Sequence, residues 1–226
     1  MEEKQPSNVD QWLERETPRV RKALEGASRY FDGNDRLTVN TLEAVYGQES
    51  SFGTMLGKRG SADAAGHFQL APDTTRRYGL SVSKKNDQRF DIDRASSAAA
   101  RYLKDLNTWF GKRTTLSERL HTIPVKSVEE RKRFVLGAFD AGEGRIAGAQ
   151  RLAEKAGENP QLWSDVAEYL ARETRQYVEM VPLYEVEFAQ KSPAKNRKEQ
   201  GVRKGKYRCT EGHWVTIDDK PVFICD

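Results

Sequence analysis

The sequence predicts a mainly α-helical protein that ends in a small β-hairpin or meander. Apolar residues recur at helical spacing through residues 1–190, and residues that cap or end helices stand between these runs. No convincing alternation of apolar and polar residues occurs before residue 206. Residues 207–226 differ, because they alternate or are rich in β-branched and aromatic residues. We therefore expect an α-helical body followed by a separate β unit.

Prolines, glycines and capping residues mark the first helices. Ser7 can cap a helix that carries an apolar stripe. Asn40, with Glu43 three residues later, resembles a capping box that opens a second helix. Pro72 suits the first turn of a short third helix, which Gly79 can end.

The later helices carry the same signals. Asp91 or Asp93 can start a helix whose apolar residues follow helical spacing. Ser127 and Glu130 form a second capping box, and Gly157 can end a further helix. The last two helices are expected to start at Pro160 and to cover residues 173–184, with a bend near Pro182.

The net charge of the chain is concentrated at its C-terminal end. The 226 residues include 38 basic and 34 acidic ones, a formal net charge of +4. Residues 191–226 hold nine basic and five acidic residues, so residues 1–190 are balanced. The balanced body argues against nucleic-acid binding, because such binding needs a large basic footprint. The segment 191–206 reads as a solvated basic linker, or as an anchor for an anionic polymer.

The sequence contains neither a membrane-spanning segment nor an evident signal peptide. No apolar run approaches the roughly 18 residues that a spanning helix needs, so we expect no membrane insertion. Residues 1–5 are acidic and polar, and no apolar segment follows them. The protein is therefore expected to stay inside the cell or to leave it by a route without a cleaved signal, unless the sequence lacks its leader.

Two cysteines, Cys209 and Cys225, lie in the β-rich end. A disulfide between them would close a loop of about 17 residues and contribute roughly 3 kcal/mol. Two free thiols are the alternative. Cys209, His213 and Cys225 form only a weak zinc pattern, so we expect no metal and no other cofactor.

One carboxylate lies on an apolar helix stripe. Leu42, Val45, Tyr46 and Glu49 fall at positions i, i+3, i+4 and i+7 of the second expected helix. A carboxyl group on such a face is desolvated, and desolvation raises its pKa. Glycosidic-bond cleavage needs an acid that stays protonated near neutral pH, because the leaving-group oxygen must be protonated as the bond breaks. The alternative is a glutamate at a helix end whose carboxylate reaches water.

Four short motifs occur in the sequence, and this glutamate opens the first of them. Residues 49–52 read Glu-Ser-Ser-Phe, and residues 66–72 read Gly-His-Phe-Gln-Leu-Ala-Pro. Residues 138–142 read Ala-Phe-Asp-Ala-Gly, and residues 173–178 read Glu-Thr-Arg-Gln-Tyr-Val. In order and spacing they resemble the motifs of the goose-type-lysozyme-like family of bacterial lytic transglycosylases. That family has Glu-Ser and an aromatic residue, then Gly-Leu-Met-Gln before an apolar pair and proline, then Ala-Tyr-Asn-Ala-Gly, then Glu-Thr-Arg-x-Tyr-Val.

The resemblance spans about residues 37–185 and implies a lysozyme-like fold. The implied substrate is a peptidoglycan glycan strand, cut between N-acetylmuramic acid and N-acetylglucosamine. With the charge pattern, it divides the chain into four expected segments. These are an N-terminal helical extension over residues 1–36, a transglycosylase domain over 37–190, the basic linker over 191–206 and the β unit over 207–226.

The resemblance also implies roles for individual residues. Glu49 would be the single catalytic acid and base, and the reaction would leave a 1,6-anhydro sugar without an attacking water or a metal. Ser50 and Gln69 match positions that line the cleft of the family, and Tyr177 matches a tyrosine that reaches the site. Phe68 replaces a methionine that packs against the sugar, and a flat ring can also stack there.

Two substitutions fall in the third motif. Phe139 stands where the family usually has a tyrosine, so one hydroxyl is lost. Asp140 replaces an asparagine close to the site and, with Asp63 and Asp73, is a candidate second carboxylate. An acid and a base about 6.5–9.5 Å apart can position a water for inverting hydrolysis, so a hydrolytic muramidase is the alternative. We favour the transglycosylase, because the motifs resemble bacterial ones.

A wall-cutting enzyme that is made in the cytoplasm must still reach the periplasm and the cell wall. We expect delivery by a secretion system, as an antibacterial effector, or in a phage particle, as a lysin. Residues 213–224 are similar to short tails of phage-derived and toxin proteins. An effector would have a small immunity protein as inhibitor, and we expect the enzyme to be a monomer. A non-catalytic wall-binding module is the remaining alternative, and the glutamate in the first motif argues against it.

Overall fold

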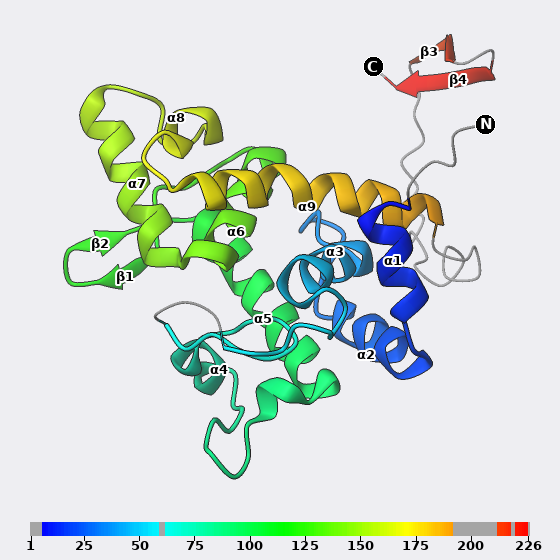
Figure 1. Ribbon diagram of the computed structural model, residues 1–226. Coiled ribbons are helices and arrows are strands. Elements are labelled where there is room, and N and C mark those ends of the chain that lie inside the picture. Colours follow the sequence, from blue (N-terminus) through cyan, green and yellow to red (C-terminus); the bar gives the residue numbers. More distant parts are fainter. Residues whose placement is uncertain (1–5, 59–61, 192–211, 218–219, 226) are drawn as a thin grey trace. The chain divides into compact units, whose positions relative to one another are not determined.

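A computed structural model of the chain describes residues 6–58, 62–191, 212–217 and 220–225, the last two segments by their backbone alone. The contacts divide the chain into two units, residues 1–191 and 192–226. The first unit is mainly helical, which confirms the predicted fold class (Figure 1). Its helices are α1 (Asn8–Arg15), α2 (Pro18–Ser28), α3 (Val39–Ser50), α4 (Pro72–Arg77), α5 (Ile92–Gly111), α6 (Val128–Ala141), α7 (Glu143–Ala156), α8 (Trp163–Ala167), α9 (Arg172–Lys191) and a 3-10 turn (Gln88–Phe90).

Several helix ends follow the capping rules that the sequence indicates. The Ser7 side chain accepts a hydrogen bond from the backbone N–H of Asp10 at 3.1 Å and so caps α1. Asp91, rather than Asp93, caps α5 through its carboxylate. Gly79 follows α4 and Gly157 follows α7, both with a φ of +81°, a conformation that suits glycine at a helix end.

The capping box expected at Asn40 and Glu43 is wrong. Helix α3 begins one residue earlier, and the backbone N–H of Thr38 donates to the Thr41 hydroxyl at 3.0 Å. Glu43 is buried inside the fold, where its carboxylate forms an ion pair with Arg21 of α2. The Glu43 carboxyl group is directed to Arg21, so it does not cap the start of α3.

Two other helix starts also differ from the expectation. Ser127 caps α6 by accepting from the N–H of Glu130 at 3.2 Å. The Glu130 carboxylate instead accepts from the N–H of Trp163 at 2.7 Å, and α8 begins at Trp163 rather than at Pro160. Helix α9 runs on past Pro182 to its end at Lys191.

Short hairpins complete the described structure. Strands β1 (Thr115–Ser117) and β2 (Leu120–His121) pair antiparallel, and they are too short for an alternating pattern to predict them. The C-terminal strands β3 (Gly212–Ile217) and β4 (Lys220–Cys225) also pair antiparallel, with Gly212 opposite Cys225, as predicted. Residues 192–206 and Cys209 lie outside the described residues, and so do all side chains of this hairpin, so the disulfide stays a prediction.

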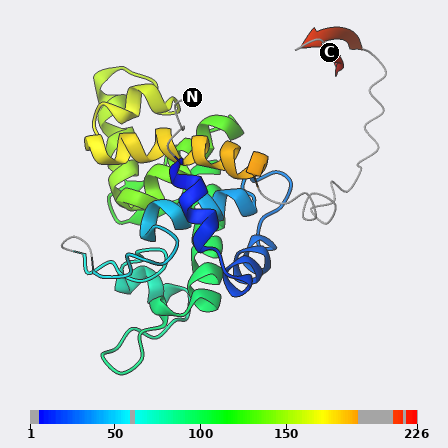
Figure 2. The same cartoon turned by 45° about the vertical axis from the view of Figure 1, so that its right-hand side comes forward.

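Helices α3 and α9 form the centre of the first unit. Helix α9 packs along α3 and also contacts α6, while α2 lies against both α3 and α5 (Figures 1 and 2). Helix α3 is buried on nearly all sides, which explains why apolar residues occur around its whole circumference. The ring of Trp12 in α1 lies against it at Gly47, where a Cβ atom would be 2.4 Å from the indole.

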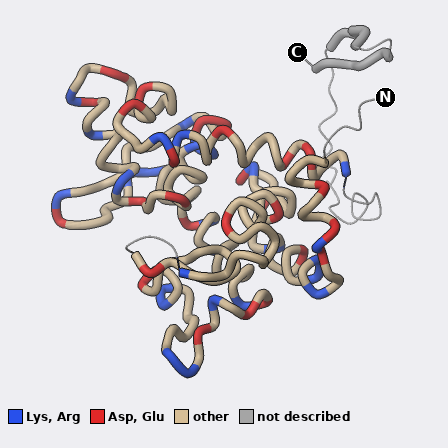
Figure 3. The backbone as a smooth tube through the Cα atoms, in the orientation of Figure 1, with Lys and Arg blue, Asp and Glu red and all other residues tan. Residues whose placement is uncertain are grey.

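Both signs of charge are spread over the described helices of residues 6–191 (Figure 3). Most of these charged residues are exposed, but Glu43 is not, and one of its carboxylate oxygens has no hydrogen-bond partner. Burial raises the pKa of Glu43 to about 7, although the paired Arg21 acts in the opposite direction. The neighbouring Glu16, which also pairs with Arg21 at 2.7 Å, adds to the rise.

We predict that Glu43 makes the fold less stable as the pH rises from about 4.5 to about 7. The folded protein holds this proton more tightly than the unfolded chain, so the stabilisation is complete below the unfolded pKa and is lost through the folded one. The Glu43→Gln variant should lack this part of the pH dependence, which is on the order of 2–3 kcal/mol. Urea unfolding at pH 4.5 to 8 measures it, with Glu154→Gln, an exposed site on α7, as control. Parallel curves for wild type and Glu43→Gln would contradict the prediction.

Candidate active site

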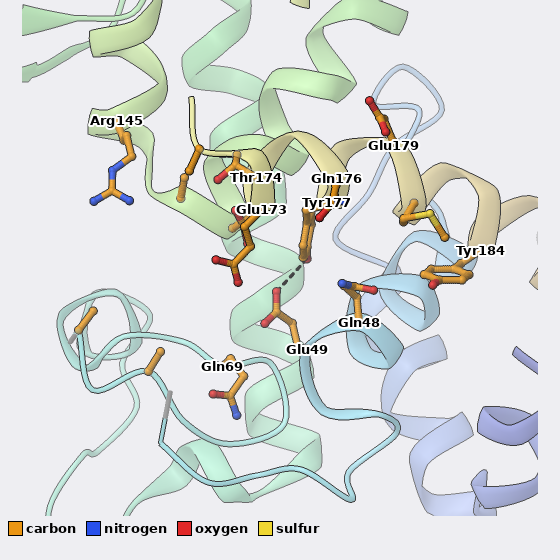
Figure 4. Close-up of a pocket in the computed structure, with 16 residues that line it drawn as sticks. Gln48, Glu49, Gln69, Arg145, Glu173, Thr174, Gln176, Tyr177, Glu179 and Tyr184 are labelled. Atoms are coloured by element: carbon orange, nitrogen blue, oxygen red, sulfur yellow. Dashed lines mark hydrogen bonds between the residues drawn. The ribbon is translucent and has the colours of Figure 1, made fainter. Parts of the chain in front are cut away.

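One pocket of about 780 Å³ opens between α3, the segment after residue 61, the junction of α6 with α7, and the first half of α9. Its walls bring together residues that lie between positions 48 and 184 of the chain (Figure 4). The described residues that line it are Gln48, Glu49, Ala62, Ala64, Gln69, Asp140, Ala141, Arg145, Ala171, Glu173, Thr174, Gln176, Tyr177, Glu179, Met180 and Tyr184.

Glu49 and Tyr177 point toward each other across this pocket (Figure 4). Glu49 lies in the last turn of α3 and is partly exposed, while Tyr177 lies in the second turn of α9 and is buried. The Tyr177 hydroxyl donates a hydrogen bond to Glu49 Oε1 at 2.9 Å. Burial, together with the negative charges of Glu49 and Asp140, raises the pKa of Tyr177 well above its ordinary value. Tyr177 therefore stays a hydrogen-bond donor at any physiological pH.

Ser50 holds the turn that follows Glu49. Its hydroxyl donates to the carbonyl of Tyr46 at 3.1 Å and accepts from the backbone N–H of Gly53 at 3.1 Å. The chain leaves α3 through left-handed backbone at Ser51 (φ +48°) and Phe52 (φ +57°), which is uncommon for such residues. Ser50 is fully buried and does not line the pocket, so its contacts fix the end of the helix that carries Glu49.

Gln69 contributes an amide to the pocket wall. Its Nε2 donates to the carbonyls of Gly66 at 3.0 Å and of Met55 at 3.3 Å. Its Oε1 is buried and has no hydrogen-bond partner, and its backbone has a φ of +44°. Strained backbone and an unsatisfied acceptor often mark a binding position, since the surrounding structure must maintain both.

Asp140 and Glu173 bring two further carboxylates to the pocket, beside Thr174. Burial raises the pKa of Asp140, and so does the charge of Glu173. A hydrogen bond from the Thr174 side chain and the charge of Arg145 act in the opposite direction. Asp140 is thus the one of the three candidate second carboxylates that lies at the pocket.

Asp63 and Asp73 lie outside this pocket. The carboxylate of Asp63 pairs with Lys58 at 3.0 Å, and that of Asp73 pairs with Arg76 at 2.8 Å. The side chains of Asp63 and Asp73 are 63% and 96% exposed, and neither lines the pocket that holds Glu49. A carboxylate beside Pro72 at the start of a surface helix suits the helix dipole and needs no further role.

Phe68 and Phe139 pack beneath the site and do not line it. Phe68 is 1% exposed, and its ring centre lies 5.3 Å from that of Tyr46 in α3. Phe139 is 8% exposed and packs against Tyr102 of α5 at 5.5 Å. A ring that is covered on both faces has no surface for a sugar, so in this structure both side chains support the wall from behind.

Several residues of the pocket were not among the candidates from the sequence, and Glu173, Arg145 and Tyr184 are three of them. Glu173 opens the same motif that contains Tyr177, so its place in the motif could have identified it. Arg145 lies three residues after the third motif, and Tyr184 lies two turns beyond Tyr177 on α9. No spacing in the sequence distinguishes these two residues from other exposed or core residues.

Helix α1 supports the end of the pocket at which Tyr184 lies. The Nδ2 of Asn8 donates to the Tyr184 hydroxyl at 3.1 Å, and the Trp12 ring packs edge-on against Tyr184 with centres 4.8 Å apart. Lys191 at the end of α9 ties the same helix by donating to Asp10 at 2.5 Å. The N-terminal helix therefore supports Tyr184 from behind, although none of its residues lines the pocket.

Some features bear on other kinds of function. Among the residues that the structure describes, no set of three histidine, cysteine or acidic side chains is arranged to hold a metal ion. No helix in the described ranges combines the length and the apolar character needed to cross a membrane.

Comparison with known proteins identifies the family to which the chain belongs. Membrane-bound lytic murein transglycosylase D of Escherichia coli strain K12 is 31% identical over 143 residues, which are 63% of this chain and 25% of that protein. Membrane-bound lytic murein transglycosylase F of Pseudomonas fluorescens is 27% identical over 164 residues, 72% of this chain and 28% of that protein. The solved structure of an inactive mutant of the lytic transglycosylase Slt from Pseudomonas aeruginosa matches with a TM-score of 0.46 and 22% identity, covering 76% of this chain and 24% of that one.

The chain spans about a quarter of the length of the curated relatives named here. Residues 29–162, more than half of the chain, match the family model described as the transglycosylase SLT domain. The chain belongs to the family of transglycosylase SLT domains.

Proposed function

We propose that this protein is a lytic transglycosylase that cleaves the β-1,4 bond between N-acetylmuramic acid and N-acetylglucosamine in peptidoglycan. The observation that carries the proposal is the hydrogen bond from the buried Tyr177 to Glu49 inside the pocket of a chain from this family. The names of the two curated relatives, both lytic murein transglycosylases, support the same substrate.

Glu49 acts first as an acid and then as a base. It protonates the glycosidic oxygen, the bond from that oxygen to C1 of the muramyl residue breaks, and N-acetylglucosamine leaves. The resulting carboxylate takes the proton from the muramyl C6 hydroxyl, whose oxygen bonds to C1 and closes a 1,6-anhydro ring. Glu49 is again protonated, and no water is consumed.

Tyr177 and Gln69 support this cycle in different ways. The hydrogen bond from Tyr177 fixes one oxygen of Glu49 and so orients the carboxyl group in the pocket. It is strongest when the carboxylate is ionised, so it stabilises the enzyme between the two proton transfers. Gln69 lines the pocket, where a side-chain amide can exchange hydrogen bonds with sugar hydroxyl and acetamido groups.

A hydrolytic muramidase on the same bond is the second candidate, and Asp140 and Glu173 favour it. Either carboxylate lines the pocket with Glu49 and could act as base on a water molecule. Hydrolysis adds a water to the product and the anhydro reaction does not, so the two chemistries differ in the mass of the released sugar.

The Glu49→Gln variant tests the catalytic role. It keeps the size of the side chain and an acceptor for Tyr177 but can neither give nor take the proton. We expect sacculus clearing, measured as loss of turbidity, to slow by about 10²–10⁴-fold. Glu168→Gln, an exposed site beyond the pocket, should clear sacculi like the wild type. Equal clearing by Glu49→Gln and wild type would remove Glu49 as the catalytic acid, and no clearing by either would favour a non-catalytic wall-binding module.

The C-terminal segment is proposed to hold the enzyme on the anionic cell wall. Residues 192–226 contain eight basic and five acidic residues, and removing them leaves the contacts of Lys191 with α1 in place. In the Glu49→Gln background, which does not consume the wall, this truncation should weaken binding to sacculi at least a few-fold in low salt. The difference should shrink in high salt. Binding that is unchanged by the truncation in low salt would remove this role.

We further propose that the protein is made in the cytoplasm and delivered to the periplasm, as an antibacterial effector or a phage lysin. The support is the similarity of residues 213–224 to short tails of phage-derived and toxin proteins. Bacteria that direct the protein to their periplasm should lyse, whereas cytoplasmic expression and periplasmic Glu49→Gln should be tolerated.

An effector also needs an inhibitor in the cell that makes it. A small immunity protein, encoded by an adjacent gene, is expected to cover the pocket and to prevent lysis when it is co-expressed. Periplasmic expression without lysis would contradict delivery as a toxin, and failure of every neighbouring gene product to protect would argue against an effector.

A further inference from the structure

The charges that line the pocket are unevenly placed. Four acidic residues line it, Glu49, Asp140, Glu173 and Glu179, and among the described lining residues Arg145 is the only cation. In the close-up view Arg145 lies at the opposite end of the pocket from Glu179 and Tyr184 (Figure 4). An anionic group on a bound ligand is therefore repelled along most of the pocket and attracted at the α7 end.

The position of Arg145 in its helix has no evident structural benefit. It is the third residue of α7, where the helix dipole favours acidic residues and disfavours a cation by roughly 0.3–1 kcal/mol. The following residue, Ile146, is fully buried, but Arg145 is exposed. Its guanidinium makes no hydrogen bond or ion pair with any residue in the described ranges, and it acts on Asp140 only through space.

We infer that Arg145 binds a carboxylate of the peptide attached to the muramyl residue, and that the enzyme thereby distinguishes peptide-bearing strands by their charge. The inference rests on the proposed cleavage of glycan strands at Glu49. A guanidinium suits this task, because it pairs with a carboxylate through two parallel hydrogen bonds and keeps its charge at any physiological pH.

This contact would also give the bound strand a direction. The peptide side of the muramyl residue lies toward α7, and its charges stay away from Glu179 at the opposite end of the pocket. The alternative role for Arg145 is to balance the charge of Asp140. That role is independent of the substrate, so substrates that differ only in peptide charge separate the two.

The test compares two forms of one soluble glycan strand that carries uncrosslinked peptides. In both forms the peptide amino groups are acetylated. In one form the peptide carboxylates stay free, and in the other they are converted to methylamides. The ratio of the two kcat/KM values, free over methylamide, measures recognition of the carboxylate. It is obtained for the wild type, Arg145→Ala, Arg145→Glu and, as control for lost charge on the same helix, Lys155→Ala, an exposed site in the last turn of α7.

We expect a ratio of about five to ten for the wild type and for Lys155→Ala, about one for Arg145→Ala, and below one for Arg145→Glu. The change should appear mainly in KM and should shrink in high salt. If wild type cuts both strands and Arg145→Ala leaves the ratio unchanged, the inference is overturned and the proposed function stands. If wild type cuts neither strand, the proposed function fails and the inference fails with it. Thermal unfolding of each variant confirms that it is folded.

Discussion

The contact between α3 and α9 is the constraint on which the rest of the structure depends. It brings Glu49 within 2.9 Å of the Tyr177 hydroxyl, although the two residues are 128 positions apart in the chain. Neither helix forms the site on its own, because α3 supplies the carboxylate of Glu49 and α9 supplies the hydroxyl of Tyr177 that orients it. Much of the remaining fold keeps these two helices in place. Trp12 packs against Gly47 of α3 and against Tyr184 and Phe188 of α9, and an ion pair joins Lys132 of α6 to Glu185 of α9.

Burial has different consequences at two groups of acidic residues in the first unit. At the pocket, carboxylates gather around Tyr177, and their charge together with burial keeps the phenol protonated as a donor. At the α2–α3 contact, Glu43 is buried beside Arg21, and its elevated pKa lowers the free energy of unfolding as the pH approaches neutrality. The acidic residues at the pocket have a place in the proposed reaction of Glu49. The second group lies away from the pocket lining, so its effect is expected in the stability of the fold rather than in the reaction.

The sequence identifies most of this arrangement because its signals are local. Ser7 and Asp91 indicate helix starts, because their side chains cap nearby backbone N–H groups. The four motifs contain the pocket residues Glu49, Gln69, Asp140 and Tyr177. What it misses depends on contacts between distant segments. The capping role expected for Glu43 fails because Arg21 lies beside it only after α2 and α3 pack. The motif predicts Phe68 near the substrate, but motif position does not determine the direction of a side chain, and the ring is buried in the core. The hydrogen bond from Asn8 to Tyr184 has no signal in the sequence.

The mass of the sugars released from purified sacculi by the wild-type protein tests the central claim most directly. If Glu49 alone gives and takes the proton, the new chain ends are 1,6-anhydro-muramyl residues, about 18 Da lighter than the hydrolysed product. Reaction in ¹⁸O-labelled water should then add no label to these ends. Muramyl residues with a free reducing end that carry the label would contradict the account, because a water would have attacked in place of the muramyl hydroxyl.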